Sequence, residues 1–262
     1  MEVNNKTAPV TGQQDQNTIS LDLMNRMKLH GMAEAFRESL AGTTPQSMTA
    51  DTFLSMLLAR EWDYRAQAAI ARLTKNAAFR YKAYIEQVDY ATNRGLDRNQ
   101  MERLATLDFV HKAQNLFITG SSGTGKSYLA CALGQEACKR GFRTFYANAP
   151  KLFGALKVAK VKGTLETELK KIERCQLLIL DDLFIVPLDA KERPILLDII
   201  EDRHERKSII ITSQYPSSNW YDIVGAPTIA DAILDRIIHT AHTIELYGES
   251  MRKLRSKKNG KF

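Results

Sequence analysis

The chain has 262 residues, of which 44% are hydrophobic, and it carries a formal net charge of +7. This length can bury a sizeable core in one or two domains, and no apolar run approaches the roughly eighteen residues that would span a membrane. The three cysteines show neither metal-site spacing nor an even count, which favours a reducing compartment, so we expect a cytoplasmic protein.

The first 112 residues are predicted to form a leader and a small helical domain. Residues 1–18 are polar and lack the apolar core of a signal peptide, so we expect a disordered leader. Residues 19–112 show helical apolar periodicity, interrupted between Gly42 and Pro45. The segment 79–90 is rich in aromatic residues but weakly periodic, and we predict an irregular or hairpin-like connector there.

From residue 113 to residue 250 short apolar runs alternate with amphipathic stretches, which is typical of a parallel α/β sheet. A basic tail, 251–262, follows. The predicted strands cover 115–119, 143–147, 176–181, 207–212 and 241–246, and the predicted helices cover 126–139, 150–160, 164–173, 189–204 and 228–238.

A phosphate-binding loop lies between the first predicted strand and its helix. The stretch LFITGSSGTGKS (116–127) contains the pattern G-x-x-x-x-G-K-[ST] in a strand–loop–helix setting. Its glycines allow several backbone N–H groups to face one anion, Lys126 suits the outer phosphates, and the Ser127 hydroxyl suits Mg²⁺. A chance glycine-rich turn is the alternative. The residues expected to hold the nucleotide are Gly120, Ser121, Ser122, Gly123, Thr124, Gly125, Lys126, Ser127 and Tyr128.

Two acids end a later apolar strand, LLILDDL (177–183). A buried parallel strand tolerates charge at its C-terminal edge, where ligands bind in open α/β sheets. Asp181 is therefore placed to hold Mg²⁺, directly or through water, and Asp182 to orient or activate an attacking water. Adjacent acids can instead be anions at a helix N-terminus.

Two further elements carry candidate catalytic residues. The strand SIIITSQYP (208–216) would lie between the loop strand and the acid strand, so Thr212, Ser213 and Gln214 would face the terminal phosphate; the alternative is a polar turn. Arg236 lies on the last predicted helix. Its permanently charged guanidinium suits phosphoryl transfer, often in a neighbouring subunit, although an isolated helix arginine is more commonly a solvated or paired surface residue.

Basic residues gather in three places. The tail 251–262 contains six Lys and Arg residues and no acid, which favours a nucleic-acid partner or a solubilising role. Basic residues including Arg80 also interleave with aromatic residues in the helical domain, where they would bind DNA or a partner protein. The stretch 151–171 would contact DNA phosphates or form a solvated helical face; its candidate residues are Lys157, Lys160, Lys162, Lys170 and Lys171.

Four motifs occur along the chain in the order GSSGTGKS, LLILDDL, ITSQYP and ILDRIIHTAHTIELYGESMRK. This order resembles the IstB family of transposition helper ATPases. These are AAA+ proteins of bacterial insertion sequences, related to DnaC-type helicase loaders. Four N-terminal stretches extend the resemblance over about residues 20–255. They are KLHGMAEAF, LLAREWDYR, AAFRY and RGLDR.

The resemblance implies an AAA+ P-loop NTPase with a five-stranded parallel sheet, preceded by a small helical domain that binds DNA or a partner. It implies ATP and Mg²⁺ as cofactors. The implied catalytic residues are Lys126, Asp182, Gln214 in the first sensor position, and Arg236 as an arginine finger. Most AAA+ proteins have Glu in place of Asp182 and often Asn in place of Gln214, so slow hydrolysis is expected. A C-terminal helical lid is not apparent, and Arg252 is a weak candidate for a second sensor arginine.

The implied function is that of a bacterial cytoplasmic regulator that assembles on double-stranded DNA and recruits or activates a transposase. Its homo-oligomer would hold ATP between subunits. The sequence leaves three alternatives: a helicase loader in DNA replication, a small-molecule kinase, which would need an acceptor pocket and an arginine-rich lid, and a nucleotide-binding module that does not hydrolyse ATP.

Overall fold

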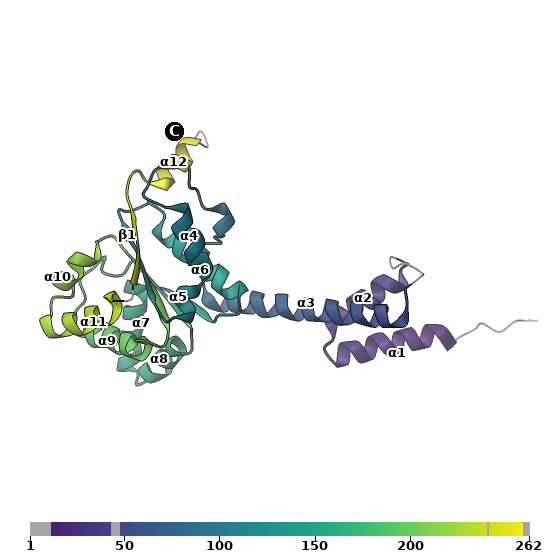
Figure 1. Cartoon of the computed structure of the whole chain (residues 1–262). Helices are drawn as coiled ribbons and strands as arrows, with labels where there is room; N and C mark the ends of the chain where they lie inside the picture. The colour runs from purple at the N-terminus through teal and green to yellow at the C-terminus, as the bar shows by residue number, and fades with distance from the viewer. Residues whose placement is uncertain (1–11, 43–47, 240, 259–262) are drawn as a thin grey trace, which may run out of the picture. The chain divides into compact units, whose positions relative to one another are not determined.

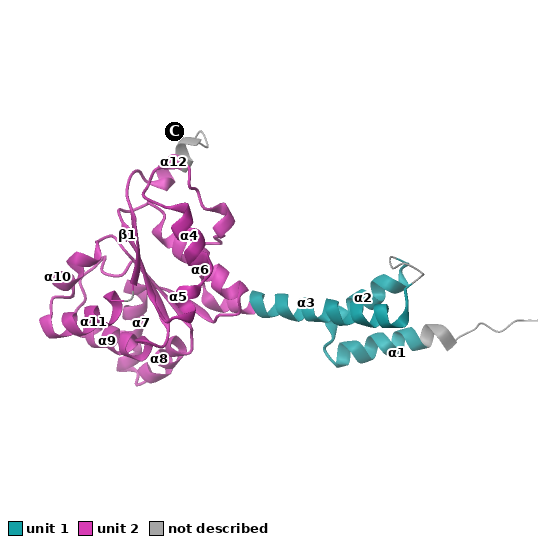
Figure 2. Ribbon diagram, viewed as in Figure 1, with its two compact units in different colours: residues 1–71 teal, residues 72–262 magenta. Residues whose placement is uncertain are grey.

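The computed structural model describes residues 12–42, 48–239 and 241–258. The chain divides into two compact units, residues 1–71 and residues 72–262 (Figure 2). Within the described ranges, no helix is both long enough and apolar enough to cross a membrane.

The first unit is built from α1 (Gly12–Arg26), α2 (His30–Leu40) and the first part of α3 (Ala50–Ala77). Small residues on α2 are buried, and a Cβ added at Gly31 would lie 2.5 Å from the Arg60 carbonyl oxygen. The helices therefore approach closely because glycine occupies this position. Because α1 begins at Gly12, residues 12–18 of the predicted leader are helical, and residues 1–11 lie outside the described residues.

A carboxylate from α3 caps α2. The residue before α2, Leu29, offers no side-chain acceptor. Glu61 Oε2 instead accepts hydrogen bonds from the backbone N–H groups of Gly31 (2.8 Å) and Met32 (3.1 Å), and Glu61 Oε1 accepts one from Arg65 Nε (2.6 Å). Free N–H groups at a helix N-terminus need such acceptors, and the positive end of the helix dipole favours an anion.

The second unit contains a five-stranded parallel sheet in the order β2-β3-β4-β1-β5. The predicted α/β fold is confirmed, with β4 between β1 and β3 as expected. Boundaries differ slightly from the predicted ones; for example, the helix predicted over 189–204 spans Glu192–Arg203. The strands are β1 (Asn115–Gly120), β2 (Thr144–Asn148), β3 (Leu177–Asp181), β4 (Ser208–Ser213) and β5 (Ala241–Leu246).

Helices cover both faces of the sheet (Figure 1). One face packs against α7 (Ala149–Val161), α8 (Leu165–Glu173), α9 (Glu192–Arg203), α10 (Trp220–Val224) and α11 (Pro227–Ile238). The other face packs against α4 (Arg98–Ala105), α5 (Asp108–His111) and α6 (Lys126–Lys139). Phe117 joins the first core whereas Leu116 and Ile118 join the second, because successive side chains of a strand point to opposite faces.

The boundary between the units falls earlier than the predicted boundary after residue 112. Residues 79–112 contribute Ala83, Val88, Met101 and Leu107 to the core that also contains β1 and α6. The segment 79–90 is irregular apart from a short 3₁₀ turn at Ile85–Gln87. Its sequence is weakly periodic because its apolar side chains reach the core from a loop.

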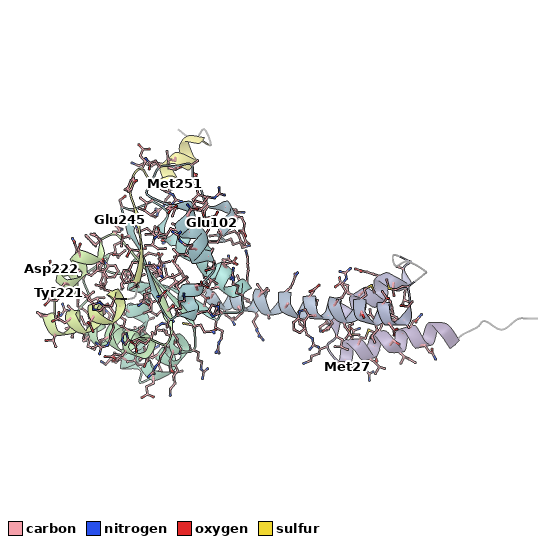
Figure 3. All side chains as sticks on the ribbon, viewed as in Figure 1. Met27, Glu102, Tyr221, Asp222, Glu245 and Met251 are labelled. Atoms are coloured by element: carbon pink, nitrogen blue, oxygen red, sulfur yellow. The ribbon has the colours of Figure 1, made fainter. Side chains whose placement is uncertain are left out.

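The C-terminal end of the described chain returns to the phosphate loop. After β5, the helix α12 (Met251–Lys258) begins at Met251, which is labelled in Figure 3. The backbone N–H of Met251 donates a hydrogen bond to the Gly123 carbonyl (2.9 Å). The tail predicted over 251–262 thus starts as a helix, and residues 259–262 lie outside the described residues.

Candidate functional site

The phosphate loop connects β1 to α6 at the C-terminal edge of the sheet. Gly120, Gly123 and Gly125 have φ values of 134°, 89° and 104°, in the region that favours glycine. A Cβ added at Gly120 would lie 1.9 Å from the carbonyl oxygen of Leu246, which no side chain could tolerate. The loop therefore needs these glycines both for its backbone conformation and for its contact with the end of β5.

Lys126, the first residue of α6, is buried and bonded to the loop itself. Its Nζ donates hydrogen bonds to the carbonyl oxygens of Gly120 (2.7 Å) and Ser121 (2.8 Å). Burial lowers the pKa of Lys126, and the nearby carboxylates of Asp182 and Asp181 oppose that effect. The ammonium group thus lies against the loop, close enough to the acid pair for their charges to act on it.

Asp181 ends β3 and is fully buried. Its Oδ1 accepts a hydrogen bond from Thr212 Oγ1 (2.6 Å), and its Oδ2 accepts one from Tyr146 Oη (2.6 Å). Burial, together with the hydrogen bond to Asp181, raises the pKa of Tyr146, which keeps this hydroxyl a donor. The sequence predicts that Thr212 faces the terminal phosphate, whereas the structure buries it and bonds its hydroxyl to Asp181. The role of Asp181 in holding Mg²⁺ stays a prediction. The sequence gives no signal for Tyr146, which lies on β2 and reaches the acid only through the sheet.

Asp182 has an unusual backbone conformation that turns the chain at the end of β3. Its φ is 59°, and its backbone N–H donates to Thr212 Oγ1 (2.9 Å). Its Oδ2 accepts a hydrogen bond from Asn148 Nδ2 (3.2 Å). Burial and the adjacent charge of Asp181 raise the pKa of Asp182, while Arg80 and Lys126 lower it, and the net shift is upward. A carboxylate with a raised pKa is a better proton acceptor than an ordinary aspartate.

Arg80 lies beside both acids. Its Nη1 is 3.7 Å from Asp181 Oδ2 and 3.7 Å from Asp182 Oδ2, and its guanidinium is 5.3 Å from the centre of the Tyr81 ring. The sequence groups Arg80 with basic residues expected to contact DNA or a partner. The structure adds a contact that the sequence does not predict, because the chain after α3 places the Arg80 side chain beside the end of β3, and the contact with DNA or a partner stays a prediction.

A cavity of about 360 Å³ brings these groups together. Of the residues predicted to act on the nucleotide, it is lined by Ser122, Gly123, Gly125, Lys126, Ser127, Tyr128, Asp182 and Gln214. The sequence does not predict a place in the nucleotide site for seven further lining residues: Arg80, Tyr81, Lys82, Asp89, Arg94, Ile185 and Met251. Arg252, the weak sensor candidate, also lines the cavity.

Arg94 holds the loop from outside the sheet. It is buried, and its Nη1 donates to the Thr124 carbonyl (2.6 Å) while its Nη2 donates to the Asp89 carbonyl (3.0 Å). The burial of Arg94 cannot be read from the stretch RGLDR, so the sequence gives no direct signal for this role. Because Thr124 lies within the phosphate loop, the contact ties the N-terminal part of unit 2 to the nucleotide site.

Arg236 does not line this cavity. On α11 its Nη2 forms an ion pair with Glu201 Oε1 (2.7 Å), and its Nη1 donates to the Ala232 carbonyl (2.7 Å). Its side chain is 27% exposed. The structure thus places Arg236 away from Lys126 of its own chain, and the finger role stays a prediction that needs a second subunit.

The lysines predicted to contact DNA are divided between paired and exposed positions. Lys157 forms ion pairs with Asp189 (2.9 Å) and Glu192 (2.7 Å). Lys170 and Lys171 pair within α8 with Glu166 (3.8 Å) and Glu168 (2.7 Å) respectively, whereas Lys160 and Lys162 are exposed at the end of α7. The contacts of these lysines with DNA stay a prediction. For the three paired lysines, DNA phosphates would have to compete with the acidic side chains that already bind them.

The donors near the loop suit magnesium. Ser127, Asp182 and Gln214 line the cavity with a hydroxyl, a carboxylate and an amide oxygen, whereas the buried Asp181 does not line it and has both oxygens hydrogen-bonded to Thr212 and Tyr146. Mg²⁺ prefers such oxygen ligands and keeps several waters, so a site with few protein donors beside phosphates fits this ion.

Comparisons with known proteins agree with this geometry. The family model described as "IstB-like ATP binding protein" matches residues 22–259. The chain is 43% identical over 240 residues to a protein of Sinorhizobium fredii named as an insertion sequence ATP-binding protein, y4pL, covering 92% of this chain and 98% of that protein.

Two solved structures share the fold of the second unit. DnaI is 27% identical with a TM-score of 0.54, over 63% of this chain and 91% of DnaI. The DnaC helicase loader is 24% identical with a TM-score of 0.52, over 63% of this chain and 97% of that chain. At this level of identity the similarity to DnaC concerns the fold alone. The predicted AAA+ P-loop fold is confirmed.

Proposed function

This chain belongs to the family of IstB-like ATP binding proteins, and from that premise we propose that it hydrolyses ATP while assembling on duplex DNA, where it recruits or activates a transposase. The named relative comes from an insertion sequence, which supports a transposase as the partner. The proposal for hydrolysis is carried by one observation: Asp181 and Asp182 are fixed by a shared hydroxyl within reach of a glycine loop and a buried lysine.

Each residue would then have a distinct task. The N–H groups of the loop and the ammonium of Lys126 would bind the phosphates, as in other P-loop sites. Ser127 and Asp181 would hold Mg²⁺, which when bound neutralises charge that develops on the phosphate oxygens. Asp182 would accept a proton from the attacking water through its raised pKa, and Gln214, which shares the cavity, would orient that water.

The proposed assembly of several copies of the chain rests on the position of Arg236. Arg236 lies outside the cavity and pairs with Glu201. A guanidinium supplied in trans is a common way to complete a phosphoryl-transfer site. We therefore place ATP between two copies of the chain, one contributing the loop and acids and the other contributing Arg236, so that ATP favours the assembled state on DNA.

A helicase loader is the second candidate, since the sequence resembles a family related to DnaC-type loaders and the DnaC helicase loader shares the fold of the second unit. Light scattering of the wild-type protein with ATP, and with duplex or single-stranded DNA, distinguishes the two. Lys126→Ala serves as the nucleotide-binding variant, and Lys112→Ala, at an exposed lysine, is the control.

We expect assembly only with ATP and duplex together, loss of assembly in Lys126→Ala, and normal assembly in Lys112→Ala. Unchanged scattering of the wild type on adding ATP and duplex would refute assembly on DNA. Assembly that requires single-stranded DNA would favour the loader.

A further inference from the structure

Arg80 is positioned as a cation of the nucleotide site, contributed by the segment that directly follows α3. Its Nη1 lies 3.7 Å from one oxygen of Asp181 and 3.7 Å from one oxygen of Asp182, and the residue lines the cavity that Lys126 also lines. Lys126 approaches from the phosphate loop. The two cations therefore face the same acid pair from different elements.

The contacts of Arg80 hold it near the acids without fixing it on them. A separation of 3.7 Å exceeds the 2.7–2.9 Å or so of a charge-assisted hydrogen bond. The Tyr81 ring supports the guanidinium at 5.3 Å, and the Arg80 side chain is 45% exposed. The guanidinium can thus shift by a small distance toward a stronger anion that enters the cavity.

The position of Arg80 indicates which phosphate that anion would be. In the function proposed above, Asp182 orients the water that attacks the terminal phosphate, so a group 3.7 Å from the Asp182 carboxylate lies at that end of the triphosphate. Planar guanidinium groups bind phosphate oxygens with two donors, which suits this role better than an ammonium would. ADP lacks this phosphate and would leave Arg80 on the acids.

We propose that Arg80 binds the terminal phosphate of ATP within its own chain, so that a single subunit distinguishes ATP from ADP before a second subunit supplies Arg236. This inference rests on the proposed ATPase site but not on assembly, DNA or a transposase. It assigns to the stretch AAFRY, at residues 77–81, a direct part in nucleotide recognition.

The test is an equilibrium titration with a fluorescent non-hydrolysable ATP analogue and with the matching fluorescent ADP, each with Mg²⁺. It uses the full chain at concentrations where sedimentation shows a monomer. The variants are Arg80→Ala, Arg80→Lys, and Arg72→Ala as a control at an exposed arginine of α3.

We expect Arg80→Ala to weaken binding of the ATP analogue about tenfold and binding of ADP less than about twofold, the scale of one charge-assisted hydrogen bond. Arg80→Lys should recover part of the difference, because it restores the charge but not the planar pair of donors, and Arg72→Ala should bind both nucleotides normally. Retained ADP affinity also shows that the loop in the variant is folded.

Four outcomes would overturn the inference. An equal loss for both nucleotides would make Arg80 a support for the fold of the site, and unchanged binding of the ATP analogue would remove any contact. Tighter binding of the ATP analogue by Arg80→Ala would mean that Arg80 only competes for the acids. Failure of the wild-type protein to bind either nucleotide would reject the proposed ATPase function as well.

Discussion

Replacing Thr212 with valine removes a hydroxyl that serves both acids of the site while keeping the shape of the side chain. Thr212 Oγ1 donates to Asp181 Oδ1 at 2.6 Å and accepts from the backbone N–H of Asp182 at 2.9 Å. Asp181 is completely buried, so its oxygen cannot find water in exchange. Thr212→Val should therefore destabilise the second unit and displace Asp182.

The magnitude follows from the two lost contacts. A hydrogen bond to a charged group contributes about 1.5–3 kcal/mol, and a buried N–H group left without an acceptor costs about 1–3 kcal/mol. The two effects share one atom and do not add fully, so we expect a loss of about 3 kcal/mol in the free energy of unfolding. The ATPase rate should fall as well, because the turn at Asp182 has a positive φ and depends on this acceptor.

Urea denaturation followed by the fluorescence of the buried Trp220 measures the stability of the unit that contains the site. Thr212→Ser keeps the hydroxyl and should lose less than half as much stability. Thr243→Val, at an exposed position of β5, is the matched control and should change little. A Thr212→Val protein within about 0.5 kcal/mol of the wild type, or a Thr212→Ser protein that is equally destabilised, would refute the reasoning.

Three further predictions concern single residues in the two units. Asp182→Asn keeps a side chain that tolerates positive φ, so it should retain ATP binding in a filter assay while hydrolysis drops by about 100-fold or more; normal turnover would exclude Asp182 as the base. Burial raises the pKa of Glu61, but hydrogen bonds from Arg65 and from the amides at the start of α2 outweigh burial, so the net pKa in the folded state lies below 4.5. The stability that the Glu61 carboxylate contributes is therefore present above pH 4.5 and is lost as the pH falls through the folded pKa. The melting temperature of Glu61→Gln should thus lie below that of the wild type at pH 7, with a gap that narrows below pH 4.5; a gap that widens there would contradict the sign. Gly31→Ala should cost about 1–3 kcal/mol by thermal unfolding, because its Cβ would lie 2.5 Å from a backbone oxygen, whereas Gly154→Ala, with nothing within 4 Å, should be neutral or stabilising.

The parallel sheet was predictable because its signals are local. The central strands β1, β3 and β4 are buried on both faces and read as apolar runs, as in Leu177–Asp181, whereas the edge strand β5 alternates between exposed and buried residues near its end. The order of the central strands followed from chemistry, since the phosphate loop and the acid pair require a polar strand end between them. The pairing of β4 with both β1 and β3 confirms that reasoning.

The remaining features of the site arise from contacts between distant segments, which no local pattern encodes. Tyr146 reaches Asp181 because β2 and β3 are paired in register, with Asn148 opposite Asp181. Arg80 meets the acids because the irregular segment 79–90 carries it to the end of β3. The aromatic residues of this segment have no periodicity, so the sequence does not indicate where the segment runs. Lys157 looks like a free cation in the sequence until the fold places Asp189 beside it.

The strand order has a consequence for the sequence of events during synthesis. The phosphate loop follows β1, but both neighbours of β1, the strands β4 and β5, are made much later, and the backbone of Met251 closes on Gly123 only near the end of the chain. Domains fold as their parts emerge from the ribosome, and long-range pairing waits for its partner strand. A nascent chain therefore carries the nucleotide-binding motif, without a finished nucleotide-binding site, from the synthesis of Ser127 until that of β5 and Met251. In the function proposed above, a response to ATP would have to wait until these late segments have been made.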